Sequence, residues 1–118
     1  MDNESIRSYC LSLPHVTEDI QWECDLLFRV GKKMFAVIVL DTKYPHRFSF
    51  KCSPEKFAEL IEMDGIIPAP YSARYHWVAL LSLDIFSDSE LKKLIKDSYD
   101  LVFAKLPKKL KAELSQSG

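Results

Sequence analysis

Two apolar runs joined by a short turn restrict the fold more than any other feature of the chain. LLFRV (26–30) and MFAVIVL (34–40) are rich in β-branched and aromatic residues, and they flank Gly31-Lys32-Lys33. This pattern around a glycine-containing turn is typical of a β-hairpin. The next run, RFSFK (47–51), alternates polar residues with phenylalanine, as a half-buried strand does. Because these strands follow one another through short loops, we expect an antiparallel sheet.

Helical patterns lie on both sides of these strands. Apolar residues recur at helical spacing from about 3 to 13, and Ser53-Pro54 and SDSE (87–90) are typical helix starts. The helix after SDSE has an apolar stripe formed by Leu91, Leu94, Ile95, Ser98 and Val102. LPHVTED (13–19) is expected to be a turn, and WVALLSL (77–83) a further strand. The order predicts an α+β sandwich in which helices cover one face of the sheet.

The length fits one compact domain. The 118 residues can build one hydrophobic core, so we expect a single domain over 1–118 with a lysine-rich tail from about residue 107. No run of about 18 apolar residues is present, and the polar start MDNESIRSYC does not resemble a secretion signal. We therefore expect a cytoplasmic protein that does not bind membranes.

Four stretches together resemble the MmcQ/YjbR family of small bacterial proteins. They are LPHVTED, VGKKMFAV, PAPYSARYHW and LIKDSYDLVFAKLPKKL, and the resemblance extends from about Ile6 to Leu110. It implies a CyaY-like (frataxin-like) sandwich, an antiparallel sheet with helices packed on one face. It also implies a DNA-binding role attributed to paired β-hairpin wings. The positions that match the family pattern are Leu13, Pro14, Thr17, Glu18, Asp19, Gly31, Lys32, Phe35, Gly65, Pro68, Tyr71, Arg74, His76 and Trp77.

Two positions depart from the family pattern. His15 and Glu23 stand where the family commonly has glycine. We expect less tight turns at these two positions, since a side chain disfavours the left-handed backbone that glycine adopts freely.

Bases gather around the predicted hairpin turns. If the turns at 31–33 and 41–46 project side by side, these bases would meet the phosphates of double-stranded DNA. In the alternative interpretation, they protect exposed turns and strand edges from aggregation. The candidate nucleic-acid-binding residues are Arg29, Lys32, Lys33, Lys43, His46, Arg47 and Lys51.

Charge is also unevenly distributed along the chain. The net charge is −1, but residues 1–25 carry six acids against one arginine, and residues 92–111 carry seven lysines against two aspartates. Such polarity could steer an anionic partner to one end of the molecule. It could equally reflect solvated helix faces.

The aromatic loop YSARYHW suggests a second, alternative site. Tyr71, Arg74, Tyr75 and His76 could line a pocket for a small molecule or hold a protein partner. If a strand includes residue 75, alternation puts Tyr75, Trp77, Ala79 and Leu81 on one face and His76, Val78 and Leu80 on the other. Neither face would be wholly polar, which favours Trp77 as a core residue rather than a platform for a ligand.

No arrangement of side chains indicates an enzyme. Thr17-Glu18-Asp19 beside His15 could hold a metal, but adjacent side chains on an extended segment point to opposite faces, which favours a structural role. His15, His46 and His76 lie in separate loops without metal-ligand spacing, and no nucleophile has a paired base. The cysteines Cys10, Cys24 and Cys52 are expected to be free thiols, at least two of them buried. We expect no catalytic site, metal or cofactor.

Overall fold

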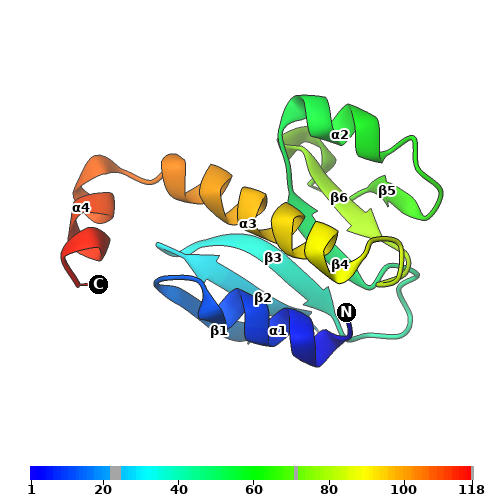
Figure 1. The fold of residues 1–118 in the computed structure, drawn as a ribbon, viewed down its shortest axis with the longest axis horizontal. Coiled ribbons are helices and arrows are strands. Elements are labelled where there is room, and N and C mark those ends of the chain that lie inside the picture. Colours follow the sequence, from blue (N-terminus) through cyan, green and yellow to red (C-terminus); the bar gives the residue numbers. More distant parts are fainter. Residues whose placement is uncertain (22–24, 71, 118) are drawn as a thin grey trace.

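The computed structural model describes residues 1–21, 25–70 and 72–117, and these form an antiparallel sheet with helices on one face (Figure 1). The six strands lie in the order β1-β2-β3-β4-β6-β5. Their bounds are β1 (Val16–Gln21), β2 (Asp25–Val30), β3 (Lys33–Val39), β4 (Phe48–Lys51), β5 (Ile66–Pro68) and β6 (Trp77–Leu80). The helices are α1 (Asn3–Ser12), α2 (Pro54–Leu60), α3 (Asp88–Ala104) and α4 (Lys108–Ser117), with a short 3₁₀ helix, η1 (Ala73–Tyr75). The α+β sandwich is confirmed.

The predicted hairpin is β2 and β3, and its turn is tight. Gly31 and Lys32 both have positive φ angles, 56° and 71°, as two-residue hairpin turns of type I′ require. Phe28 pairs with Ala36, whereas Arg29 pairs with Met34, so Phe35 is an extra residue in β3. This β-bulge strengthens the local twist.

The main core lies between the sheet and the helices. All five residues of the predicted stripe on α3 are buried, and Ile6 and Cys10 of α1 are fully buried beside them. From the sheet, phenylalanines on β2, β3 and β4 fill this core, together with Val78 and Leu80 of β6. Trp77 and Ala79 belong to a second apolar cluster on the other face, which confirms the predicted alternation along this strand.

Ser98 joins the bulged strand to its neighbour inside the core. Its hydroxyl donates a hydrogen bond to the carbonyl oxygen of Phe35 at 2.7 Å and accepts one from the amide of Lys51 at 3.0 Å. These two backbone groups lie just beyond Ala36 and Phe50, where the pairing of β3 with β4 ends. The Ser98 hydroxyl therefore takes the place of the next backbone hydrogen bond between β3 and β4.

The structure corrects the prediction of a turn at 13–19. Val16–Gln21 is the edge strand β1, and every residue of it pairs with β2, from Val16 with Val30 to Gln21 with Asp25. The turn itself is shorter, and His15 adopts the left-handed backbone with φ of 65°. The turn is therefore not loosened by the histidine, contrary to expectation. Glu23 lies outside the described residues.

Two of the three cysteines are buried free thiols, as expected. Burial raises the pKa of Cys10 to about 12 and that of Cys52 to about 11, which disfavours the reactive thiolate. Cys24 lies outside the described residues. None of the described helices is long and apolar enough to cross a membrane.

Candidate nucleic-acid interface

The two turns with basic residues lie at opposite ends of β3. One connects β2 to β3 at residues 31–32, and the other connects β3 to β4 through residues 40–47. Since β3 has seven residues, the turns are separated by roughly 20 Å along the strand. They do not project side by side, so the candidate residues divide into two groups.

In the β3–β4 loop at residues 40–47, which we call the far loop because it lies at the opposite end of β3 from the β2–β3 turn, two of the bases contact other parts of the loop. The guanidinium of Arg47 donates to the backbone carbonyl oxygens of Asp41, at 3.1 Å, and Tyr44. His46 lies beside Tyr44, with ring centroids 6.0 Å apart, on the sheet face away from the helices. Lys43 is exposed in this loop. Of these three bases, only Lys43 extends freely into solvent.

The β2–β3 turn packs against the junction of α3 and α4. A Cβ atom on Gly31 would lie 2.6 Å from a methyl carbon of Leu106 and 3.1 Å from one of Leu110. Glycine is therefore needed here both for its positive φ and for the close approach. Lys32 and Lys33 are exposed at this turn, whereas Arg29 forms an ion pair with Asp19 at 3.1 Å.

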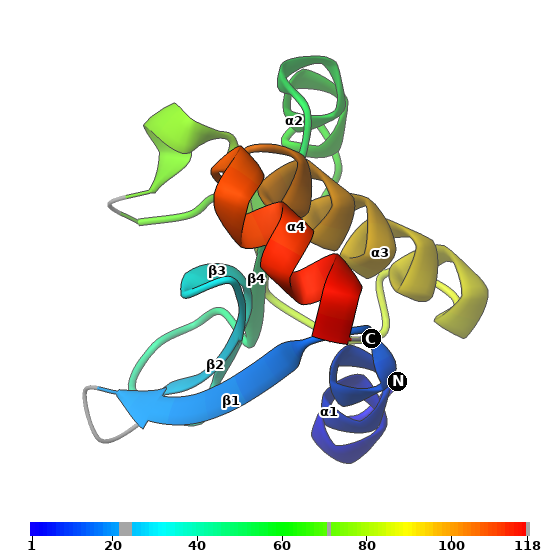
Figure 2. The same ribbon diagram turned by 90° about the vertical axis from the view of Figure 1, so that its left-hand side faces the viewer.

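The contact at Gly31 brings the turn to the lysine-rich tail. Pro107 separates α3 from α4, and in Figure 2 α4 faces the viewer at the end of the molecule where α3 finishes. Lys105, Lys108 and Lys109 are exposed there. Lys111 donates to the carbonyl oxygen of Ala104 at 3.1 Å, across the junction.

Lys51 connects this end to the aromatic loop. Its ammonium donates to the carbonyl oxygen of Tyr75 at 2.5 Å, and partial burial together with the nearby charge of Lys105 lowers the pKa of Lys51. The Arg74 guanidinium lies over the Tyr75 ring, 4.8 Å from its centroid, and that ring is 52% exposed. Lys51 and Arg74 thus both contact Tyr75, the lysine at its carbonyl oxygen and the arginine at its ring.

The other members of the aromatic loop have different surroundings. His76 is half-buried, packs edge-on against Phe57 at 5.7 Å and accepts a backbone hydrogen bond from Cys52. Trp77 is 6% exposed, in the second apolar cluster. Tyr71 lies outside the described residues.

We define the basic end as the lysines contributed by the β2–β3 turn, the end of β4 and the α3–α4 junction. Among the described residues, none of these lysines forms an ion pair with a carboxylate. Glu113 is the one acidic residue of α4. The members of the basic end are Lys32, Lys33, Lys51, Lys105, Lys108, Lys109 and Lys111.

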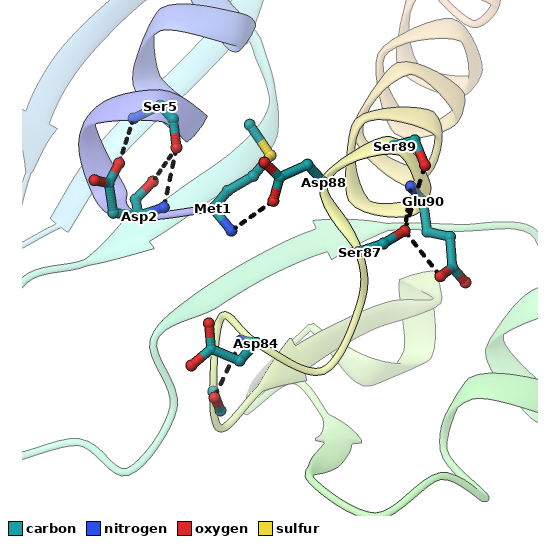
Figure 3. Close-up of polar contacts among 9 residues, drawn as sticks. Met1, Asp2, Ser5, Asp84, Ser87, Asp88, Ser89 and Glu90 are labelled. Carbon is teal, nitrogen blue, oxygen red and sulfur yellow. Dashed lines mark hydrogen bonds and ion pairs between the residues drawn. The ribbon is translucent and has the colours of Figure 1, made fainter.

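Acidic residues gather at the opposite end of the molecule, where α1 and α3 begin. Figure 3 shows Asp2 as the cap of α1, accepting from the Ser5 amide at 2.8 Å, and Asp88 paired with the Met1 amino group at 3.0 Å. Asp84 and Glu90 lie nearby in the same view. Because α3 has 17 residues, the two ends are separated by roughly 25 Å along this helix. The structure therefore separates these acids from the basic end, although Lys92 and Lys93 lie near them in the first half of α3.

The acids of β1 are held in ion pairs. Glu18 accepts from Arg7 through both carboxylate oxygens, at 2.7 and 2.8 Å, and Asp19 pairs with Arg29 instead. The two neighbouring carboxylates thus have different partners, as expected for an extended segment. Within the described part of the chain, no group of three histidine, cysteine or acidic side chains could hold a metal ion.

The sequence identified Lys32, Lys33 and Lys51 as candidates, and it left open whether the lysines of the tail add to the same field or only complement the helix dipole. The lysines of the tail were visible as a run of positive charge, yet their position depends on the direction of α3 across the sheet. The sequence signal for this arrangement was Gly31, because a glycine in the β2–β3 turn permits the close contact with Leu106 at the end of α3.

Comparisons with known proteins agree with this architecture. A family model described as YjbR matches residues 11–101. The chain is similar to the crystal structure of the Deinococcus radiodurans protein DR2400, which carries the family-model domain DUF419. The TM-score is 0.82 and the identity 31%, with 95% of this chain and 86% of that chain covered. A Pseudomonas syringae protein shares the fold with a TM-score of 0.69 and 23% identity, over 86% of this chain and 98% of that one. A search of curated proteins found no significant match.

Proposed function

This chain belongs to the YjbR family, and we propose that it binds double-stranded DNA through its basic end. The observation that supports the proposal is the convergence of lysines from three separate segments at one end of the molecule. Duplex DNA is bound mainly through its phosphates, which exchange counterions for lysine and arginine side chains. A local positive field can serve this purpose in a protein whose net charge is −1.

The proposed interface uses one hairpin turn and not a pair. Lys32 and Lys33 come from the β2–β3 turn, and the helical junction takes the place of a second wing. Arg74 adds a further positive charge at the ring of Tyr75, whose carbonyl oxygen accepts from Lys51. The acidic end, at the start of α3, would face away from the DNA and oppose binding in the reverse orientation. DNA binding requires access to the chromosome, in keeping with the expected cytoplasmic location in a bacterial cell.

A titration of a fluorescently labelled 20-base-pair duplex tests the proposal. At roughly 50 mM salt we expect a Kd below about 100 μM, in the range of nonspecific association. If about four to six phosphates are contacted, log K should fall against log salt with a slope of about −4 to −5. Anisotropy of the labelled duplex measures both quantities. An unchanged anisotropy up to 100 μM protein would contradict the proposal.

A further inference from the structure

The sheet face away from the helices contains a cavity of about 500 Å³. This volume is within the range of small-molecule pockets, roughly 300–1,000 Å³. The cavity differs from the basic end in charge, because no lysine or arginine lines it among the described residues. It uses none of the side chains on which the proposed DNA interface rests.

Apolar side chains form the floor and one wall of the cavity. Val37 and Val39 of β3 are buried on this face, and Trp77 of β6 is buried at its side. Between these strands, β4 contributes only the small side chain of Ser49, and the loop after β5 contributes Ala69. Small residues beside a tryptophan leave room for the body of a ligand.

Two acidic side chains and a histidine line the same cavity, from the start of β2 and from the β3–β4 loop. Asp25 begins β2, Asp41 follows β3, and His46 precedes β4. Burial is the main cause that raises the pKa of Asp25, and the charge of Asp41 adds to it, while His46 opposes it. Burial and Arg47 lower the pKa of His46, which favours the neutral ring, although Asp25 opposes this shift. The cavity thus contains two acidic side chains, Asp25 and Asp41, and no lysine or arginine among the described residues of its lining.

His46 has a ring nitrogen beside the cavity without a partner in the described part of the chain. Its Nδ1 atom is buried and has no hydrogen-bond partner among the described residues. Because this nitrogen has almost no accessible surface, a ligand in the cavity would lie beside the His46 ring and not at Nδ1.

We propose that this cavity binds a small organic cation, an amine attached to a compact apolar body. The ammonium group lies between Asp25 and Asp41, where its N–H groups reach the two carboxylates beside the His46 ring. The apolar body packs on Val37, Val39 and Trp77, and the tryptophan ring also attracts a nearby cation through its π face. An anionic ligand would meet two carboxylates at close range, so the charge of the lining selects against it.

Phenethylamine is a suitable probe, with 2-phenylethanol and 3-phenylpropionate as neutral and anionic analogues. Each is titrated to 10 mM while amide and indole signals of the ¹⁵N-labelled full chain are recorded. We expect saturable shifts at Val39, Ser49 and Trp77 with the amine, at least fivefold weaker binding of the alcohol, and weakest binding of the acid. No saturable shift with the amine, or equal or tighter binding of the acid, would overturn the proposal.

Variants locate the charge that recognises the amine. Asp25→Asn and Asp41→Asn should each weaken binding of phenethylamine at least fivefold, and the double variant should weaken it more. Asp84→Asn is the matched control, because Asp84 is exposed and lies outside the cavity. Dispersed spectra show that each variant is folded. Unchanged affinity in the folded double variant, or an equal loss in the control, would also overturn the proposal.

Discussion

Reversing the charge of Lys32 and Lys33 to glutamate should weaken binding to duplex DNA about tenfold or more, because two phosphate contacts become repulsive. Adding Lys108→Glu and Lys109→Glu should extend the loss to about 100-fold and make the salt dependence shallower. The added glutamates begin α4, where a negative charge stabilises a helix through its dipole. We therefore expect the variant with all four substitutions to remain folded, which a thermal unfolding curve would verify.

The double variant Lys43→Glu/Lys93→Glu is the matched control for Lys32→Glu/Lys33→Glu. It changes the net charge equally, but both lysines are exposed and lie outside the basic end, Lys43 in the far loop and Lys93 on α3. We expect it to bind DNA within about threefold of the unmodified protein at moderate salt, since distant exposed charges are largely screened. Equal losses in the two double variants would show that only net charge matters and would contradict a localised interface.

Removing one hydroxyl from the core should have the largest effect on stability. Ser98→Ala leaves both the Phe35 carbonyl oxygen and the Lys51 amide without the partner that the hydroxyl provides. Each unsatisfied buried group costs about 1–3 kcal/mol, so we expect the free energy of unfolding to fall by about 3 kcal/mol. Urea denaturation measures this difference.

Ser8→Ala provides the comparison for this substitution. Ser8 is exposed on α1, and its replacement should change the free energy of unfolding by less than about 0.5 kcal/mol. A loss below about 1 kcal/mol in Ser98→Ala would mean that water or a rearranged backbone satisfies the two groups. The bridge between the bulged strand and β4 would then contribute little.

Features set by local periodicity were predicted from the sequence. The stripe on α3 follows the helical repeat, and the β2–β3 hairpin follows from β-branched runs around Gly31. The polar Ser98 within that stripe was also correctly placed in the core, although its bridging role depends on the bulge at Phe35. Local sequence does not show which strand has an extra residue.

Features that depend on pairing between distant segments were missed. β1 was taken for a turn because its acids, Glu18 and Asp19, resemble a polar loop, while the arginines that neutralise them lie in α1 and β2. The cavity is formed by residues as distant in sequence as Asp25 and Trp77. Alternation along each strand could have shown which side chains share a face, but only the strand order brings Val37, Val39 and Trp77 together on one face of the sheet.

The separation of the candidate bases into two groups also depends on how the strands pair. Clustering within residues 29–51 suggested one surface, but consecutive turns of an antiparallel meander fall on opposite ends of the shared strand. Lys32 therefore neighbours the distant tail, while Lys43 does not.

Mapping the DNA contact on the protein tests the central claim most directly. A 12-base-pair duplex is titrated into the ¹⁵N-labelled chain, and the amide shifts are followed residue by residue. The structure predicts the largest shifts at residues 31–33 and 105–111, with little change at 41–47 and at the acidic start of α3. Shifts centred on 41–47 or on 84–90, with 31–33 and 105–111 unaffected, would contradict a DNA interface at the basic end.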